Sequence, residues 1–184
     1  MKDENITRQL DKLKVFFLKY YPIRIKNVGL EEKVARQIVW DFKDGNHYEA
    51  VAQMTAKRLV EHFGEQVCNI VFSCVPASTS EKHEHRYKNF SSRVCELSGA
   101  VNGYEHVRVT NDRPKVQKNR KKKDVQIQEN VIYDEDFFKG KRILVFDDII
   151  TRGHSYANFA NRLEMFGAEV LGGFFLGKTF YKVK

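Results

Sequence analysis

The sequence lacks the features that define several large classes of protein. It has only three cysteines, Cys68, Cys74 and Cys95, and they form no CxxC pair. That number and spacing argue against a disulfide framework or a zinc site and are typical of reduced thiols in the cytoplasm. No apolar run approaches the ~20 residues of a membrane span, and FFLKYYPI is broken by Lys19 and Pro22. The polar start MKDENITRQL has no apolar core of a secretory signal. We therefore expect a cytoplasmic protein that does not enter a membrane.

Positive charge is present in excess, but it is concentrated in one segment. The net charge is +8 over 184 residues, and seven Lys and Arg lie within residues 113–123. Without those seven the net charge is +1. This segment has three interpretations. It binds a nucleic acid, it binds a small polyphosphate, or it is a solvated loop that has no partner.

Helical periodicity dominates the first third of the chain. Apolar residues recur at helical spacing over residues 6–20, 30–40 and 48–63, and the first and last of these segments end near Pro22 and Gly64. We predict an N-terminal helical extension over residues 1–64, which would form a hood above a core domain of residues 65–184.

The core pattern alternates strands with helices. Nearly continuous apolar runs over residues 67–75, 142–148 and 169–177 predict strands that are covered on both faces. Residues 89–98 and 154–166 have helical spacing, residues 105–110 alternate as a strand does, and VQIQENVIY resembles a hairpin arm. The prediction is an α/β fold with an open, mainly parallel sheet flanked by helices.

One stretch, ILVFDDIITRGHS at residues 143–155, carries most of the chemistry. In an open parallel sheet, ligands bind outside the carboxyl ends of the strands, where Asp147 and Asp148 fall. Their carboxylates accept hydrogen bonds and suit vicinal hydroxyls or a metal. Behind them, Gly153 relaxes the backbone, Thr151 and Ser155 offer hydroxyls, and a helix start presents N–H groups to an anion. Together these features predict a sugar-phosphate site.

The same stretch resembles the phosphoribosyl-pyrophosphate motif of type I phosphoribosyltransferases, an apolar strand followed by D-D-x-x-T-x-G-x-S. Every fixed position matches. The resemblance implies that fold, with Asp147 and Asp148 on the ribose 2- and 3-hydroxyls. It also implies a 5-phosphate loop made of Thr151, Arg152, Gly153, His154 and Ser155. The alternative is an acidic strand end followed by an ordinary helix N-terminus.

Further segments are similar to the ComF-like branch of that family. RYKNF at residues 86–90 resembles its R-G-F-N segment with one inserted residue, and WDFKDG resembles its F-K-x-x-G entry. RPKVQKNRKKKDVQIQENV resembles its mobile loop, and the resemblance covers residues 38–178. The four-cysteine zinc module of that branch is absent from this sequence.

The segment after the first core strand is the expected diphosphate loop. Its small residues would let backbone N–H groups approach a diphosphate, and two cations of the next segment would add charge. This set is Val75, Pro76, Ala77, Ser78, Thr79, Arg86 and Lys88. Magnesium would arrive with the substrate, so no direct protein ligand is assigned to it. The alternative is a simple strand-to-helix turn with Arg86 on the surface.

In this context the basic segment is interpreted as a lid. A mobile loop over residues 111–130 would close over the diphosphate and exclude water. Its named members are Arg113, Lys115, Gln117, Lys118 and Arg120. Nucleic-acid binding through residues 113–123 stays open, although no aromatic residue lies between Arg113 and Gln128 to stack on bases.

Two other patterns are rejected. GGFFLGKT at residues 172–179 matches the P-loop spacing, but its interior is strand-like and too few residues follow for a helix. His83 and His85 form an HxH pair with no nearby third ligand, so we expect surface histidines.

Three functions follow in order of preference. The first is a phosphoribosyltransferase that uses phosphoribosyl pyrophosphate and magnesium, with a nitrogenous acceptor that the sequence does not identify. The second is a non-catalytic sensor of that sugar, or a competence-related protein, acting on a nucleic acid or protein partner. The third is a nucleic-acid-binding protein with no small-molecule site. A homodimer stays open.

Overall fold

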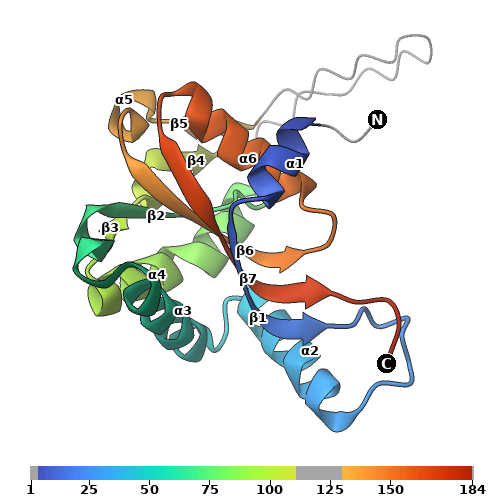
Figure 1. Ribbon diagram of the computed structural model, residues 1–184. Helices are drawn as coiled ribbons and strands as arrows, with labels where there is room; N and C mark the ends of the chain where they lie inside the picture. Colours follow the sequence, from blue (N-terminus) through green and yellow to red (C-terminus); the bar gives the residue numbers. More distant parts are fainter. Residues whose placement is uncertain (1–3, 111–129, 184) are drawn as a thin grey trace.

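A five-stranded parallel sheet forms the centre of the molecule (Figure 1). The computed structural model describes residues 4–110 and 130–183. The strands lie in the order β1 (Leu13–Tyr20), β7 (Glu169–Thr179), β6 (Arg142–Ile150), β2 (Ile70–Cys74) and β3 (Val101–Asn102). All neighbouring pairs are parallel. The predicted α/β class with an open parallel sheet is therefore confirmed.

Helices cover both faces of this sheet. Strand β6 shows why, because its successive side chains alternate between two apolar cores: Leu144 and Phe146 belong to one, Ile143 and Val145 to the other. The first core is covered by α2 (Leu30–Lys43), α3 (Tyr48–Phe63) and α4 (Ser80–Ser98). The second is covered by α1 (Glu4–Leu10), α5 (Glu135–Phe138) and α6 (His154–Met165).

Shorter elements connect these layers. A 3₁₀ segment over Gly64–Asn69 leads into β2, and another over Tyr104–His106 precedes a small antiparallel hairpin. That hairpin pairs β4 (Val107–Val109) with β5 (Val131–Tyr133). The hairpin arm expected in VQIQENVIY is thus confirmed for its last three residues.

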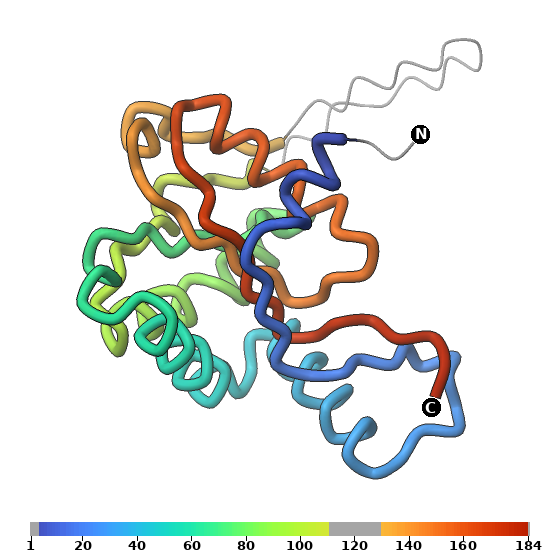
Figure 2. The backbone as a smooth tube through the Cα atoms, viewed as in Figure 1, coloured from blue at the N-terminus to red at the C-terminus, as the bar shows by residue number. Residues whose placement is uncertain are grey.

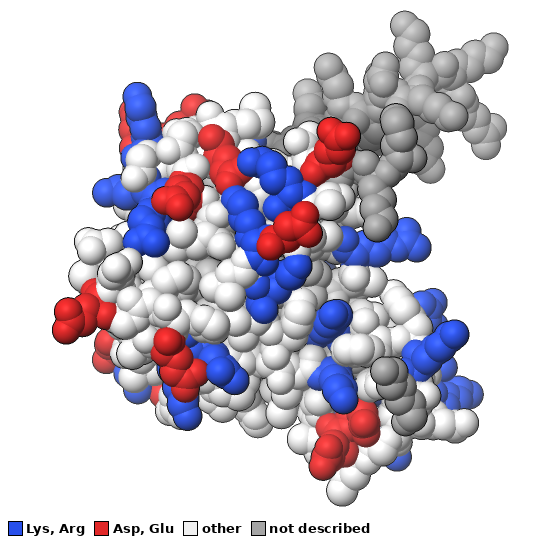
Figure 3. Space-filling model, in the orientation of Figure 1, with Lys and Arg blue, Asp and Glu red and all other residues white. Residues whose placement is uncertain are grey.

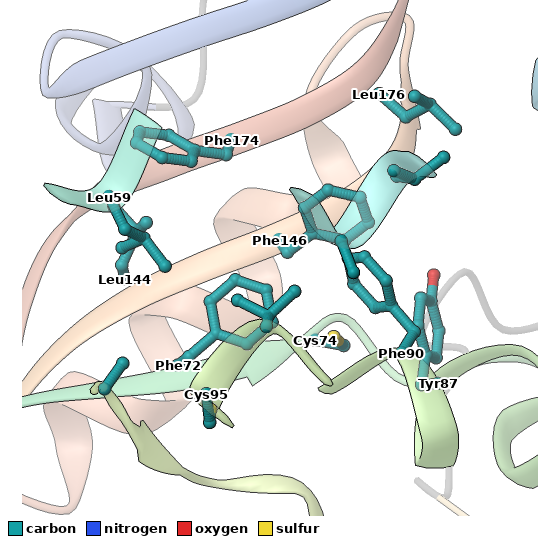
Figure 4. Packing of buried hydrophobic residues seen from close by; sticks show 14 of the residues in the cluster. Leu59, Phe72, Cys74, Tyr87, Phe90, Cys95, Leu144, Phe146, Phe174 and Leu176 are labelled. Carbon is teal, nitrogen blue, oxygen red and sulfur yellow. The ribbon is translucent and has the colours of Figure 1, made fainter. Parts of the chain in front are cut away.

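Phe146 lies at the centre of the first core, directly before the two acids. Its ring centroid is 4.6 Å from that of Phe90, 5.8 Å from Phe42 and 6.0 Å from Phe72. Figure 4 shows the rings of Phe146, Phe90 and Phe72 in this core, with Tyr87 beside Phe90. Because aromatic packing of this kind fixes side chains in single rotamers, it holds the end of β6 in place.

The N-terminal region differs from the prediction. Residues 6–20 do not form one helix: α1 ends at Leu10, and Leu13–Tyr20 is an edge strand of the central sheet. The apolar residues Ile6, Leu10, Leu13 and Phe17 fit helical spacing, yet LKVFFLKY also suits a pleated strand rich in aromatic residues. Pairing with the free edge of β7 decides between the two.

The extension over residues 1–64 is therefore not an all-helical unit, because β1 belongs to the core sheet. Figure 2 shows the N-terminal strand running beside the C-terminal one. The helices predicted over residues 30–40 and 48–63 are confirmed as α2 and α3. None of the helices in the described part of the chain is both long and apolar enough to cross a membrane.

The position of β1 gives a test of the fold. A chain that begins at residue 21 leaves seven registered positions along β7 without their partners. We expect it to aggregate and to lose its cooperative unfolding transition, because an unpaired apolar strand edge associates with other chains. Circular dichroism during heating and size-exclusion chromatography would measure this. A chain lacking only residues 1–3 is the control, and a normal transition in the longer truncation would contradict the assignment.

Candidate functional site

The two acids lie near the carboxyl end of β6, which continues beyond the predicted end at residue 148 to Ile150, and both are buried. Consecutive residues of a strand point to opposite faces of a sheet. Asp147 accordingly lines a pocket of about 250 Å³ together with residues 149–156. Asp148 instead contacts side chains from α2 and α4. The predicted acidic pair therefore divides into two environments.

Asp147 is held close to its own backbone. One carboxylate oxygen, Oδ1, accepts a hydrogen bond of 2.9 Å from the backbone N–H of Asp148. Burial, followed by the neighbouring charge of Asp148, raises the pKa of the Asp147 carboxyl well above its usual value. Lys43 and Arg86 act in the opposite direction but do not cancel these effects. A carboxyl of this kind gains strongly from a partner that stabilises its charged form.

Asp148 is engaged by two cations. Arg86 of α4 donates from its guanidinium to Oδ2 of Asp148, and Nζ of Lys43 lies 3.8 Å from Oδ1. Arg86 also donates from Nε to the carbonyl of Lys43 at 3.2 Å, which joins α2, α4 and β6 at one point. Arg86 was expected at the diphosphate, and the surface position considered as the alternative is not found, since its side chain is mostly buried.

The turn after β6 has the predicted form. Gly153 has a φ of 80°, a left-handed conformation that glycine adopts without strain, and it precedes α6. No side chain caps α6 and no acid lies in its first turn. The first N–H groups of a helix have no partner within the helix, so this end can receive an anion. Thr151, Arg152, Gly153, His154 and Ser155 all line the pocket.

Two neighbours of this turn were missed by the sequence analysis. The Oγ1 atoms of Thr151 and Thr179 lie 2.8 Å apart, which ties the turn to the end of β7. A Cβ atom on Gly153 would lie 2.6 Å from Cδ2 of Leu10, because α1 packs behind the turn. Neither contact has a sequence signal, since both join residues far apart in the chain. Lys43, also missed, stands in the WDFKDG segment that carried a family resemblance.

The expected diphosphate loop, residues 75–79, lies beside Asp147 because β2 pairs with β6. Two of its N–H groups are already used: Val75 donates to the Phe146 carbonyl at 2.8 Å, and Ala77 donates to Nδ1 of His83 at 3.4 Å. Pro76 has no N–H group. The backbone N–H groups of Ser78 and Thr79 make no hydrogen bond with another described residue. They are therefore the donors of this loop that remain for a ligand. No described peptide bond is cis.

Lys88 does not join this group. It forms an exposed ion pair of 2.7 Å with Glu84, one turn earlier on α4. Residues two positions apart on a helix point about 200° away from each other. Arg86 and Lys88 therefore cannot both face the end of β6, and the structure directs Arg86 there.

The basic segment lies outside the described residues, so its predicted members Arg113, Lys115, Gln117, Lys118 and Arg120 are not placed. Its two flanking residues are placed. The N–H of Thr110 donates to the carbonyl of Asn130 at 2.7 Å, and the Asn130 amide donates to the Ser78 carbonyl at 3.4 Å. Thr110 and Asn130, which flank residues 111–129, therefore lie beside the 75–79 loop.

The remaining candidates from the sequence are the two histidines, the P-loop-like segment and a metal site. His85 is exposed, but His83 is buried against Tyr104, and burial lowers its pKa to about 4. The expectation of a surface position was wrong for His83, because it stacks within the core. Residues 172–179 belong to β7, which confirms the rejection of a P-loop. No three His, Cys, Asp or Glu among the described residues gather as a metal site.

Comparison with protein-family models matches no family, and comparison with curated proteins finds no significant relative.

The buried Asp147 makes stability depend on pH. A carboxyl whose pKa is raised by folding destabilises the folded state as pH rises from its unfolded to its folded pKa. We expect Asp147→Asn to melt at higher temperature than the wild type near pH 8. This advantage should shrink toward pH 5, by about 1.4 kcal/mol per unit of pKa shift. Thermal melts across that range measure it, and a constant difference would contradict the assignment.

The Arg86–Asp148 contact is open to a double-mutant test. Arg86→Gln leaves a buried carboxylate with only the distant Lys43, and we expect a loss of about 3 kcal/mol in unfolding free energy. Adding Asp148→Asn should recover most of that loss, because no uncompensated charge remains. Urea denaturation gives both values. Lys88→Gln, which removes an exposed ion pair, is the control and should cost under about 1 kcal/mol. Additive effects of the two substitutions would argue against the contact.

Proposed function

We propose that the chain binds phosphoribosyl pyrophosphate with magnesium and transfers the phosphoribosyl group to a nitrogenous acceptor, with release of pyrophosphate. The supporting observation is that four of the five fixed motif residues, Asp147, Thr151, Gly153 and Ser155, line one pocket. The uncapped start of α6 belongs to the same pocket. The finer assignment to a type I phosphoribosyltransferase of the ComF-like branch rests on the motif residues.

Each part of the sugar phosphate would have a chemical partner. The 5-phosphate would accept hydrogen bonds from the N–H groups of residues 151–155 and from the Thr151 and Ser155 hydroxyls. Arg152 and His154, which are exposed at the same turn, would add positive charge. The Asp147 carboxylate would accept from a ribose hydroxyl. Asp148 would accept a hydrogen bond from a ribose hydroxyl only after its ion pair with Arg86 is broken.

The diphosphate would lie toward the 75–79 loop. Ser78 and Thr79 would donate backbone N–H groups, and residues 111–129 would supply a lid from their anchor at Thr110 and Asn130. In the reaction the bond from ribose C1 to the diphosphate oxygen breaks and a bond to the acceptor nitrogen forms. Exclusion of water by the lid would protect the activated sugar from hydrolysis.

The residues of the pocket suit a magnesium ion that arrives bound to the substrate. It prefers oxygen ligands and usually keeps several waters while contacting one or two carboxylates and the substrate phosphates. Asp147 is the carboxylate at the pocket that could contact it. When bound, the ion would neutralise charge on the departing diphosphate.

One observation supports the second candidate, a sensor that binds the sugar without transfer. Arg86 and Lys43 interact with the Asp148 carboxylate, so this acid of the motif does not line the pocket. A site of this kind binds phosphate through the turn and α6 while holding the ribose less completely.

Isothermal titration calorimetry with phosphoribosyl pyrophosphate and magnesium tests the proposal. We expect binding by the wild type and at least a tenfold loss in Asp147→Asn, about 1.4 kcal/mol, because a neutral amide attracts neither magnesium nor hydroxyl protons as strongly. Asp136→Asn, an exposed acid on α5, is the control and should bind normally. Equal binding by all three proteins, or none by the wild type, would refute the site.

A second measurement separates transfer from sensing. Pyrophosphate release is followed in a panel of purine, pyrimidine and amine acceptors. Release that depends on one acceptor and is lost in Asp147→Asn supports the transferase. Tight binding of the sugar with no release from any acceptor would favour the sensor.

A further inference from the structure

Two segments that are far apart in the sequence, and that both lack acids, lie side by side. Residues 13–29 and 170–183 contain no Asp or Glu. The pairing of β1 with β7 brings them together, and the Phe180 N–H donates to the Tyr20 carbonyl at 2.8 Å. Their six cations are all exposed and form no ion pair with any described residue: Lys14, Lys19, Arg24, Lys26, Lys178 and Lys182. We call these side chains, with the exposed rings among them, the basic surface.

This arrangement carries an electrostatic cost in the free protein. Lys19 and Lys178 are register partners in neighbouring strands, and like charges at such positions repel each other. In Figure 3 blue side chains gather around the C-terminal end of the lower lobe, while the red acids of that lobe lie toward its lower end. A polyanion would relieve the repulsion.

Aromatic rings are interleaved with the cations. Lys178 Nζ lies 4.5 Å from the ring centroid of Phe16 and 5.8 Å from that of Phe180. The Arg24 guanidinium lies 5.0 Å from the ring centroid of Tyr181. Tyr181 is 49% exposed, so its ring retains surface for a further partner. Phe16 is 37% exposed, but its ring stacks on Phe175 at 5.6 Å between centroids and also contacts Lys178. Planar guanidinium groups and exposed rings are the surfaces on which unpaired bases stack.

We propose that the basic surface binds single-stranded nucleic acid. Its cations would contact successive phosphates, and Tyr181 and Arg24 would stack on bases, whose faces are accessible in a single strand but not in a duplex. An acidic protein would use the charges but not the exposed rings. The proposal does not depend on the sugar-phosphate pocket. It also differs from the segment at residues 113–123, where cations occur without aromatic residues.

Fluorescence anisotropy with labelled oligothymidylate and oligouridylate tests the surface in the full chain. In Lys19→Gln/Lys178→Gln we expect about tenfold weaker binding. The slope of log affinity against log salt should be shallower by about 1.4, since each lost phosphate contact on a single strand contributes about 0.7. Tyr181→Ala should weaken binding about fivefold or more through lost stacking. Circular dichroism establishes that each variant is folded.

Matched variants make the result specific. Lys139→Gln/Lys141→Gln removes the same charge from exposed positions just before β6 and should change affinity less than threefold. Asp147→Asn should bind oligonucleotides normally, which separates this surface from the pocket. Equal losses in both lysine pairs, no effect of Tyr181→Ala, equally tight binding of a duplex, or a preference for anionic lipid vesicles would each overturn the proposal.

Discussion

The position of β6 in the middle of the sheet is the constraint on which the rest of the molecule depends. Its backbone pairs with β7 on one side and β2 on the other, and its side chains enter both apolar cores. A strand fixed on four sides has no freedom to rotate. The next residues along it, Asp147 and Asp148, therefore point in opposite directions even though both are acids. The buried charge of Asp148 is compensated by Arg86 and Lys43, whereas Asp147 receives a backbone N–H.

Those partners differ in kind. Asp148 is neutralised within the protein by Arg86 and Lys43, so its charge acts on the packing of α2 and α4 against the sheet. Asp147 has a backbone N–H as its hydrogen-bond donor and a pKa raised mainly by burial. One acid thus stabilises the joint between elements, while the other stays poorly satisfied beside a cavity. A buried acid whose pKa is strongly raised is frequent in sites that act on ligands.

The sequence predicted the parts of this arrangement that depend on local pattern. The apolar run before Asp147 predicted β6, because a strand that is buried on both faces is apolar along its length. Gly153 predicted the turn, because a left-handed backbone conformation favours glycine. Long-range contacts have no such signal in the local sequence. The Arg86–Asp148 pair, the contact of Leu10 with Gly153 and the Thr151–Thr179 pair each join distant segments. Residues 13–20 were misassigned because their apolar spacing fits two periods, and only the free edge of β7 selects the strand.

The pairing of β1 with β7 also affects how the chain reaches this structure. Leu13 is registered with Gly172, about 160 residues later, so the chain as far as β7 must leave the ribosome before the first strand can pair with its neighbour. Until then, an eight-residue apolar strand stays unpaired. Contacts of such long range are slow to form because a large loop must close first. The lysines at positions 14 and 19 lie within that strand, and their charge would keep the waiting segments of neighbouring chains apart.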